Sequence, residues 1–163
     1  GHGRARADSH SELPLVNASL DELEVFDFLP FKELNDMPWA MTAHVLYSAL
    51  DERGPATTSP KVIQEVIRGK LGFDGVLVSD DVGMGALSGE LGERVNRSLE
   101  AGCDIALHCS GNMQEIIAAT KGAVAASQTS MARVQRGEVL RLESARDEIA
   151  TEAALARLEE LLA

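Results

Sequence analysis

The sequence contains few cysteines, few aromatic side chains and few basic residues. Its two cysteines, Cys103 and Cys109, lie six positions apart around one apolar segment, and along a strand this spacing is too long for a disulfide. We interpret them as two buried thiols of a protein from a reducing compartment. A zinc motif would need a second pair of ligands, so we expect no metal at these positions.

Basic residues are outnumbered, since 15 Lys and Arg face 26 Asp and Glu and leave a formal net charge of -11. This excess of negative charge argues against nucleic acid or an anionic membrane surface as a partner. No apolar run reaches the roughly 18 residues that a membrane span requires, and no charged and then apolar export segment opens the chain. We therefore expect a cytoplasmic location.

Short apolar runs alternate with helical periodicities along the chain. The runs predict strands over 38–45, 75–80 and 104–109, and the periodicities predict helices over about 19–26, 59–69, 91–101 and 113–124. Such alternation is typical of a parallel sheet, either in a doubly wound open sheet or in a (β/α)8 barrel. No Gly-x-Gly-x-x-Gly turn follows a strand, so nucleotide binding has no support.

A complete barrel needs about 250 residues and eight strands. We therefore expect the C-terminal portion of a (β/α)8 TIM-type barrel, with about three parallel strands, their helices and closing C-terminal helices. Residues 1–14 would be a mobile catalytic loop, 15–125 the βα units and 126–163 the C-terminal helices. The N-terminal half of the same barrel is the expected partner. Because half a barrel leaves open sheet edges, we expect these residues alone to be poorly stable and inactive.

Candidate functional residues gather where the predicted strands end, which is where βα proteins place their sites. Asp80 and Asp81 end an apolar strand, and carboxylates there are costly unless they are paired, hydrated or used. Asp80 is a candidate for function, whereas Asp81 is equally compatible with capping the next loop. Side-chain alternation does not separate the two, because the strand is apolar on both faces. His44 and His108 are expected to line or border a pocket.

The opening loop places Asp8 two residues before His10. In extended chain both side chains point to the same side, so Asp8 could hold one ring nitrogen and orient the other outward. This arrangement suits general acid/base catalysis near neutral pH. A solvated loop with a chance Asp-x-His is the alternative from the residues alone. A zinc site formed by His2, Asp8 and His10 has no recognised ligand spacing.

Several segments together resemble the β-N-acetylglucosaminidases of glycoside hydrolase family 3, in order and spacing over about residues 1–112. They are Gly1-His2-Gly3, Asp8-Ser9-His10, Met41-Thr42-Ala43-His44-Val45, Leu71-Gly72-Phe73-Asp74-Gly75, Ser79-Asp80-Asp81 with Met84, and Ala101-Gly102-Cys103-Asp104. The resemblance implies a cofactor-free glycosidase that releases terminal β-linked N-acetylglucosamine from peptidoglycan-derived muropeptides.

The resemblance also implies a role for each site residue. Asp80 would be the nucleophile of a retaining mechanism, and His10, oriented by Asp8, would be the acid/base. His2, His44 and Met84 would contact the sugar. Two alternatives remain open: a phosphorylase of the same family, which would pass the sugar to phosphate, and a non-catalytic βα fragment.

Overall fold

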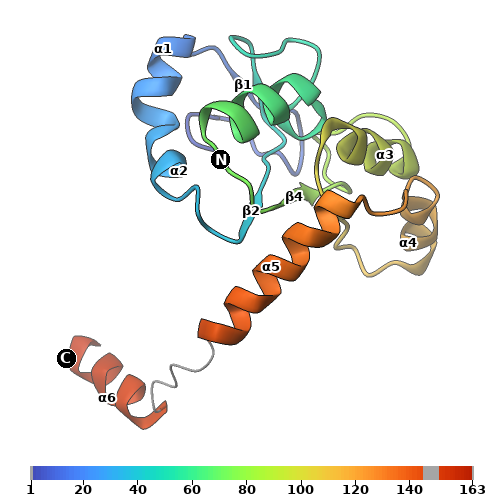
Figure 1. The fold of residues 1–163 in the computed structure, drawn as a ribbon. Coiled ribbons are helices and arrows are strands. Elements are labelled where there is room, and N and C mark those ends of the chain that lie inside the picture. The colour runs from blue at the N-terminus through green and yellow to red at the C-terminus, as the bar shows by residue number, and fades with distance from the viewer. Residues whose placement is uncertain (1, 145–150, 163) are drawn as a thin grey trace.

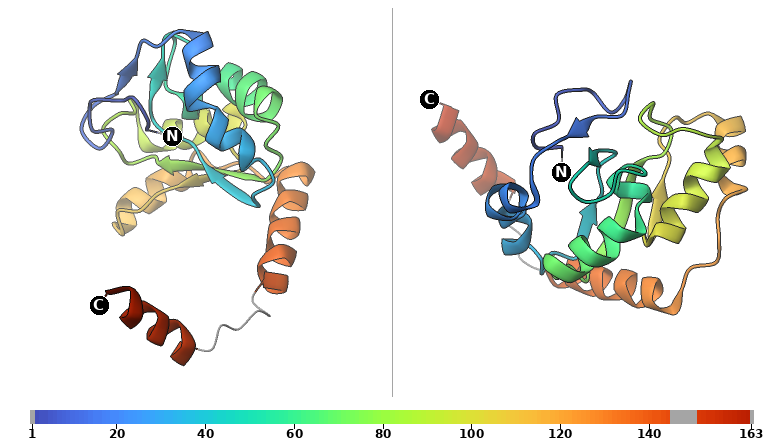
Figure 2. Two further views of the ribbon diagram at one scale, coloured as in Figure 1. Left: turned by 90° about the vertical axis from the view of Figure 1, so that its left-hand side faces the viewer. Right: turned by 90° about the horizontal axis from the view of Figure 1, so that it is seen from above.

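The computed structural model describes residues 2–144 and 151–162, and it has a mixed α/β fold with parallel sheets (Figure 1). Helices flank the strands, and the last helix lies away from them (Figures 1 and 2). In chain order the elements are β1 (Leu15–Val16), α1 (Leu20–Glu22), η1 (Leu23–Asp27), α2 (Leu29–Glu33), β2 (Trp39–Met41), β3 (Leu46–Tyr47), η2 (Ala56–Thr58), η3 (Val62–Lys70), β4 (Val76–Asp81), α3 (Leu91–Ala101), β5 (Ile105–Leu107), α4 (Met113–Thr120), α5 (Gln128–Ser144) and α6 (Thr151–Leu162).

The strands form two parallel sheets, one with the order β2-β4-β5 and one that pairs β1 with β3. The three predicted strands correspond to β2, β4 and β5. The predicted strand 38–45 is shorter in the structure, because after Thr42 the chain leaves β4 and pairs Leu46 with Leu15 in the second sheet. The sequence did not predict β1 or β3, because two residues are too few to show an alternating pattern.

The predicted helices are confirmed, with changes in their hydrogen bonding and length. Ser19 and Glu22 form the expected capping box before α1. Helices η1 and η3 are π-helical, with bonds five residues apart such as Leu71 N–H to the Val66 carbonyl. Helix α3 ends at Ala101 and is followed by Gly102, whose φ of 117° is left-handed, as expected of a C-terminal glycine. Helix α4 ends at Thr120, four residues before the predicted end.

The buried core lies between the sheet and the helices that follow its strands. Ile63 of η3, Leu77 of β4 and Ala101 of α3 pack with Phe73 and Cys103 in one apolar cluster. Burial raises the pKa of the Cys103 thiol to about 12, whereas Cys109 is exposed, so the prediction of a buried thiol is wrong for Cys109. Because each strand is fixed by helices on its flank, the strand ends hold polar side chains at defined positions.

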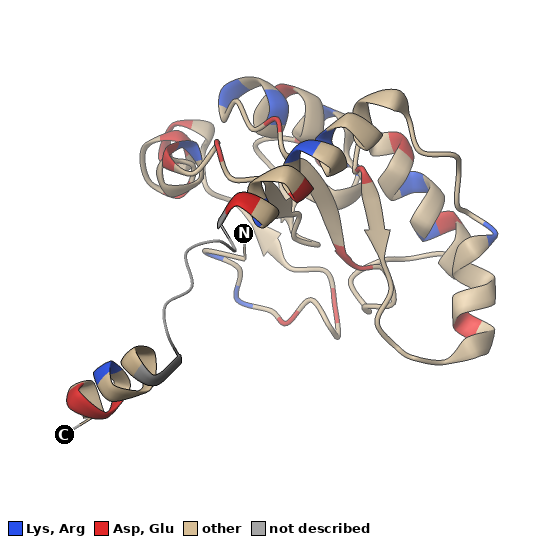
Figure 3. Ribbon diagram, turned by 60° about the horizontal axis from the view of Figure 1, so that its bottom comes forward, with Lys and Arg blue, Asp and Glu red and all other residues tan. Residues whose placement is uncertain are grey.

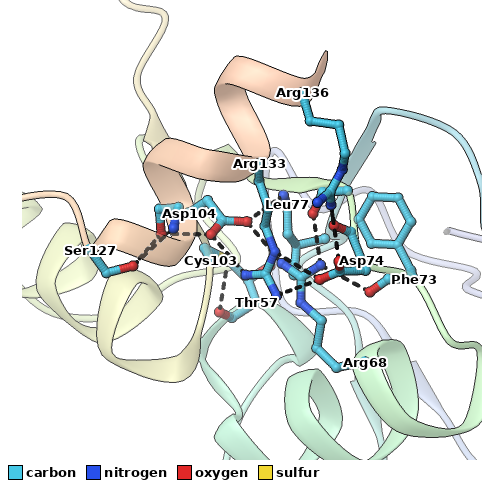
Figure 4. A network of polar contacts seen from close by, with 12 residues as sticks. Thr57, Arg68, Phe73, Asp74, Leu77, Cys103, Asp104, Ser127, Arg133 and Arg136 are labelled. Carbon is cyan, nitrogen blue, oxygen red and sulfur yellow. Dashed lines mark hydrogen bonds and ion pairs between the residues drawn. The ribbon is translucent and has the colours of Figure 1, made fainter. Parts of the chain in front are cut away.

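Helix α5 docks on the amino-terminal ends of β4 and β5 through a network of ion pairs (Figure 4). The buried Asp104 carboxylate accepts hydrogen bonds from Arg68 at 2.8 Å, Arg133 at 3.1 Å and Ser130 at 2.7 Å. Arg133 also binds Asp74 at 2.9 Å. The network lies at the opposite end of β4 from Asp80, so it fixes α5 without touching the candidate site.

Helix α6 lies apart from the sheet in all three ribbon views (Figures 1 and 2). Among the predicted segments, Gly1 of the opening motif and residues 145–150 and 163 of the C-terminal region lie outside the described residues.

Acidic positions occur on helices, on loops and at a strand end (Figure 3). None of the helices in the described part of the chain combines the length and apolar character that a bilayer crossing requires.

Candidate active site

The carboxyl end of β4 carries a β-bulge at the candidate nucleophile. Val78 pairs with Ile105 and Asp81 pairs with Leu107, so two residues of β4, Ser79 and Asp80, face one residue of β5. The buried Ser79 hydroxyl accepts the Leu107 N–H at 2.9 Å and donates to the Asp80 carbonyl at 2.7 Å. Ser79 therefore replaces a ladder partner lost at the bulge, and the bulge sets the direction of Asp80.

Asp81 fixes the carboxylate of Asp80 through the backbone. Its N–H donates to Oδ1 of Asp80 at 2.8 Å, while both side chains stay partly exposed. Its own Oδ1 accepts the Gly83 N–H at 2.8 Å and faces Nδ1 of His108 at 3.2 Å. Asp81 thus caps the following loop, which was one of its two predicted roles, and Asp80 keeps the less constrained carboxylate.

His44 lies in the core beneath these carboxylates rather than at the surface. It is fully buried, with Nδ1 2.8 Å from the Thr57 hydroxyl and Nε2 2.9 Å from the Asp81 carbonyl oxygen. Burial lowers the pKa of His44, although the Asp81 carbonyl and the charge of Asp80 oppose this shift. A neutral imidazole that donates from Nε2 satisfies both contacts, since a carbonyl only accepts.

The opening loop holds His10 beside Asp8. Oδ1 of Asp8 lies 2.8 Å from Nδ1 of His10 and also accepts the His10 N–H at 3.0 Å. Both side chains are largely exposed, so Nε2 of His10 faces outward. The hydrogen bond from Asp8 raises the pKa of His10, and the negative charges of Asp80 and Asp81 contribute in the same direction. The predicted Asp8–His10 pair therefore forms, near the predicted nucleophile.

Two backbone hydrogen bonds join this loop to the loop that follows β4. The Gly85 N–H donates to the His10 carbonyl at 2.9 Å, and the Ala86 N–H donates to the Ser9 carbonyl at 3.0 Å. The Ser9 side chain is buried and lies 2.9 Å from Nε2 of His2. The segments that carry Asp80 and His10 are thus in direct contact.

The predicted sugar-contacting residues occupy three different environments. His2 binds Ser9 in the opening loop, His44 is in the core and Met84 is 6% exposed. Both ring nitrogens of His44 already have protein partners, so the structure offers it a supporting position beneath Asp81. Direct contact of these three residues with a sugar stays a prediction. Within residues 2–144 and 151–162, no three metal-binding side chains cluster as a metal site would need.

Three features of the site were not predicted from the sequence: the Ser79 bulge, the pairing of Asp81 with His108, and the contact of Gly85 and Ala86 with the opening loop. The sequence does show a serine before the aspartates and a glycine in the following loop. Neither signal identifies its partner, because the partner lies far away in the chain.

Comparison with known proteins shows the family of this chain. Residues 1–144 match the family model described as the glycosyl hydrolase family 3 N terminal domain. The chain belongs to glycosyl hydrolase family 3. A β-hexosaminidase from Tolumonas auensis is 46% identical over 115 residues, which are 68% of this chain and 34% of that protein. One from Pseudomonas aeruginosa is 42% identical over 113 residues, again 68% of this chain and 34% of that protein.

Solved structures of the family share the fold. NagZ from Neisseria gonorrhoeae, in complex with N-trifluoroacetyl-D-glucosamine, superimposes with a TM-score of 0.77 at 32% identity over 100% of this chain and 48% of that one. A family 3 β-N-acetylglucosaminidase from Paenibacillus sp. gives a TM-score of 0.72 at 34% identity over 92% of this chain and 31% of that one. The chain spans about a third of the length of the curated family 3 relatives described above.

Proposed function

We propose that this chain carries the catalytic groups of a retaining glycosidase that releases terminal β-linked N-acetylglucosamine. The observation that carries the proposal is the Asp8–His10 pair beside the end of β4, where Asp80 and Asp81 add to the rise in the pKa of His10. Asp80 at the strand end would supply the nucleophile, and His10, on a loop bonded to the loop after that strand, would supply the proton.

In the first step, a carboxylate oxygen of Asp80 attacks the anomeric carbon and the bond to the leaving oxygen breaks. Nε2–H of His10 gives its proton to that oxygen, while Nδ1–H stays hydrogen-bonded to the Asp8 carboxylate. In the second step, the now neutral Nε2 takes a proton from water. The water oxygen bonds to the anomeric carbon, Asp80 leaves, and the configuration is retained after two inversions.

A histidine suits this acid/base role on electrostatic grounds. Most retaining glycosidases use two carboxyl groups about 5 Å apart. The acid/base carboxyl group must then stay protonated beside the negatively charged nucleophile. Neutral imidazole does not repel Asp80, and its unperturbed pKa of about 6.5 allows both proton transfers near neutral pH. The exposed position of His10 leaves it accessible to a bound sugar.

We also propose that the two sheets are part of a (β/α)8 barrel that further strands complete. Among the described residues, β2 and β5 each pair on one edge only. Large apolar side chains stand exposed on η1 and β2, including Phe26 of η1 at 67% and Trp39 of β2 at 43%. Additional strands and helices would cover these groups and would supply the remaining sugar-binding residues. Peptidoglycan-derived muropeptides in the cytoplasm are the substrate class that the family resemblance favours.

Trapping with a fluorinated N-acetylglucosaminide tests this function in the full-length protein that contains this sequence. The reagent should inactivate the enzyme, and peptide mapping should place the label on Asp80. A label on Asp81, or no label, contradicts the assignment of the nucleophile. Product analysis with and without inorganic phosphate then separates hydrolysis from phosphorolysis, since a sugar 1-phosphate product contradicts the hydrolase.

A further inference from the structure

We infer that Gly85 and Ala86 form a backbone seat that positions the acid/base His10 over the nucleophile. This inference rests on the proposed function, because it takes His10 and Asp80 in those roles. Gly85 is a positioning residue here, since it touches the His10 loop and no reacting atom. The family assignment alone does not point to it.

The seat consists of two consecutive N–H groups that face two consecutive carbonyls. Gly85 N–H binds the His10 carbonyl at 2.9 Å and Ala86 N–H binds the Ser9 carbonyl at 3.0 Å. On the other side of the loop, the Ser11 and Glu12 N–H groups bind the Asp8 carbonyl at 3.0 and 3.1 Å. His10 therefore lies within a hydrogen-bonded turn that its own carbonyl joins to Gly85, while its side chain stays exposed.

The seat is linked to the nucleophile by only a short stretch of chain. The Met84 N–H donates to the Asp81 carbonyl at 3.1 Å, and the same carbonyl lies 2.9 Å from Nε2 of the buried His44. The Asp81 N–H in turn binds the Asp80 carboxylate. The nucleophile and the seat of the acid/base thus belong to one hydrogen-bonded turn, and a shift of the seat changes the placement of His10 relative to Asp80.

Glycine at position 85 is required by space rather than by backbone conformation. A Cβ atom there would lie 2.7 Å from the His10 carbonyl oxygen and 2.8 Å from that of Ser11, and both are backbone atoms. The φ angle of Gly85 is not among the positive values in the chain, so alanine is acceptable to the local backbone. Alanine at position 85 must therefore push the His10 loop away.

The Gly85→Ala variant of the full-length protein tests the seat through the leaving group of the substrate. Dinitrophenolate leaves from its glycoside without a proton, whereas the leaving oxygen of an alkyl glycoside needs a proton from His10. We expect kcat/KM to fall by about 10²-fold or more for the alkyl glycoside and much less for the dinitrophenyl glycoside. Azide, which attacks without a general base, should raise kcat of Gly85→Ala and give a glycosyl azide. Labelling of Asp80 by the fluorinated glycoside should persist.

Gly54→Ala is the matched control, because the nearest atom to its new Cβ is the Thr58 hydroxyl at 3.4 Å. It should behave as the wild type toward both glycosides. An unchanged leaving-group dependence in Gly85→Ala, or an equal loss for both glycosides without azide rescue, overturns the inference. A wild type that neither hydrolyses nor labels at Asp80 contradicts the proposed function instead.

Hydrogen exchange on the wild-type protein tests the seat without relying on a folded variant. The amides of Gly85 and Ala86 should be protected, because the His10 and Ser9 carbonyls accept them. Exchange of both amides at the rate of free loop amides overturns the inference.

Discussion

Nε2 of His44 lies 2.9 Å from the backbone carbonyl oxygen of Asp81, the residue whose N–H binds the carboxylate of Asp80, the proposed nucleophile. The imidazole is fully buried and is fixed on its other side by Thr57, which in turn contacts Thr42 at 2.8 Å. A chain of buried polar groups therefore runs from β2 to the end of β4. The histidine supports the site from below, and it does so as a neutral donor.

Replacing His44 by phenylalanine should reduce stability and activity together. The ring would no longer donate to the Asp81 carbonyl, and the Thr57 hydroxyl would lose one partner, so we expect a loss of about 1–3 kcal/mol in the free energy of unfolding. His44→Gln retains an N–H donor and should recover part of both. Urea unfolding and kcat measurements on the two variants test this, and equal defects would contradict a hydrogen-bonding role.

His44 also predicts how stability depends on pH. Burial lowers its pKa below the ordinary value of about 6.5, so the unfolded state binds the proton more readily than the folded state. The stabilisation is fully present above pH 6.5 and is lost as the pH falls below this value toward the folded pKa. Unfolding free energies measured across this range should decline less steeply in His44→Phe than in the wild type. Parallel curves would contradict the shift.

The Asp8 carboxylate should set the basic limb of the activity profile. It raises the pKa of His10 mainly through a hydrogen bond to the ring, and His10 must be protonated to act as acid. In Asp8→Asn the basic limb of kcat/KM should move to lower pH, and the rate at alkaline pH should fall. Pre-steady-state labelling of Asp80 by a dinitrophenyl fluoroglycoside should change little. A basic limb at unchanged pH would remove Asp8 from this role.

Loss of the Ser79 hydroxyl should disturb the orientation of Asp80, the proposed nucleophile. Ser79→Ala leaves the Leu107 N–H without its acceptor at the bulge, at an expected cost of about 1–3 kcal/mol. We expect kcat to fall because Asp80 loses its fixed orientation. Ser98→Ala is the matched control, since Ser98 is equally buried but binds only the Arg94 carbonyl within its own helix. Equal kcat values for the two variants would contradict the role of the bulge.

Stability and activity should separate at Asp104. Burial alone would raise the pKa of Asp104, but hydrogen bonds from the Leu77 N–H, Ser130 and Arg133 outweigh it and lower the pKa. Asp104→Asn leaves Arg68 and Arg133 without their shared carboxylate, so we expect a loss of about 3–5 kcal/mol in unfolding free energy. Under conditions in which the Asp104→Asn variant is folded, it should keep the wild-type kcat. A matching loss of kcat would show that the network reaches the active site.

Local features of the chain were well predicted where a short segment carries its own signal. The capping box of Ser19 and Glu22, the end of α3 at Gly102 and the buried strand before Asp80 are examples. The Asp8–His10 contact was also predicted, because the two residues are close in sequence and share one side of an extended loop. Strands β1 and β3 were missed, since each depends on its partner rather than on a pattern of its own.

The sequence by itself determined the alternation of strands and helices that is typical of a parallel sheet, and it identified the candidate catalytic side chains. Only the tertiary structure decided the orientation of these side chains. The strand before Asp80 is apolar on both faces, so its pattern carries no information on side-chain direction, and the bulge against β5 supplies it. His10 and Gly85 are 75 positions apart, and His44 and Asp81 are 37 apart. Hydrogen bonds between such distant residues form only after the core has packed, because packing is what brings their strand ends together.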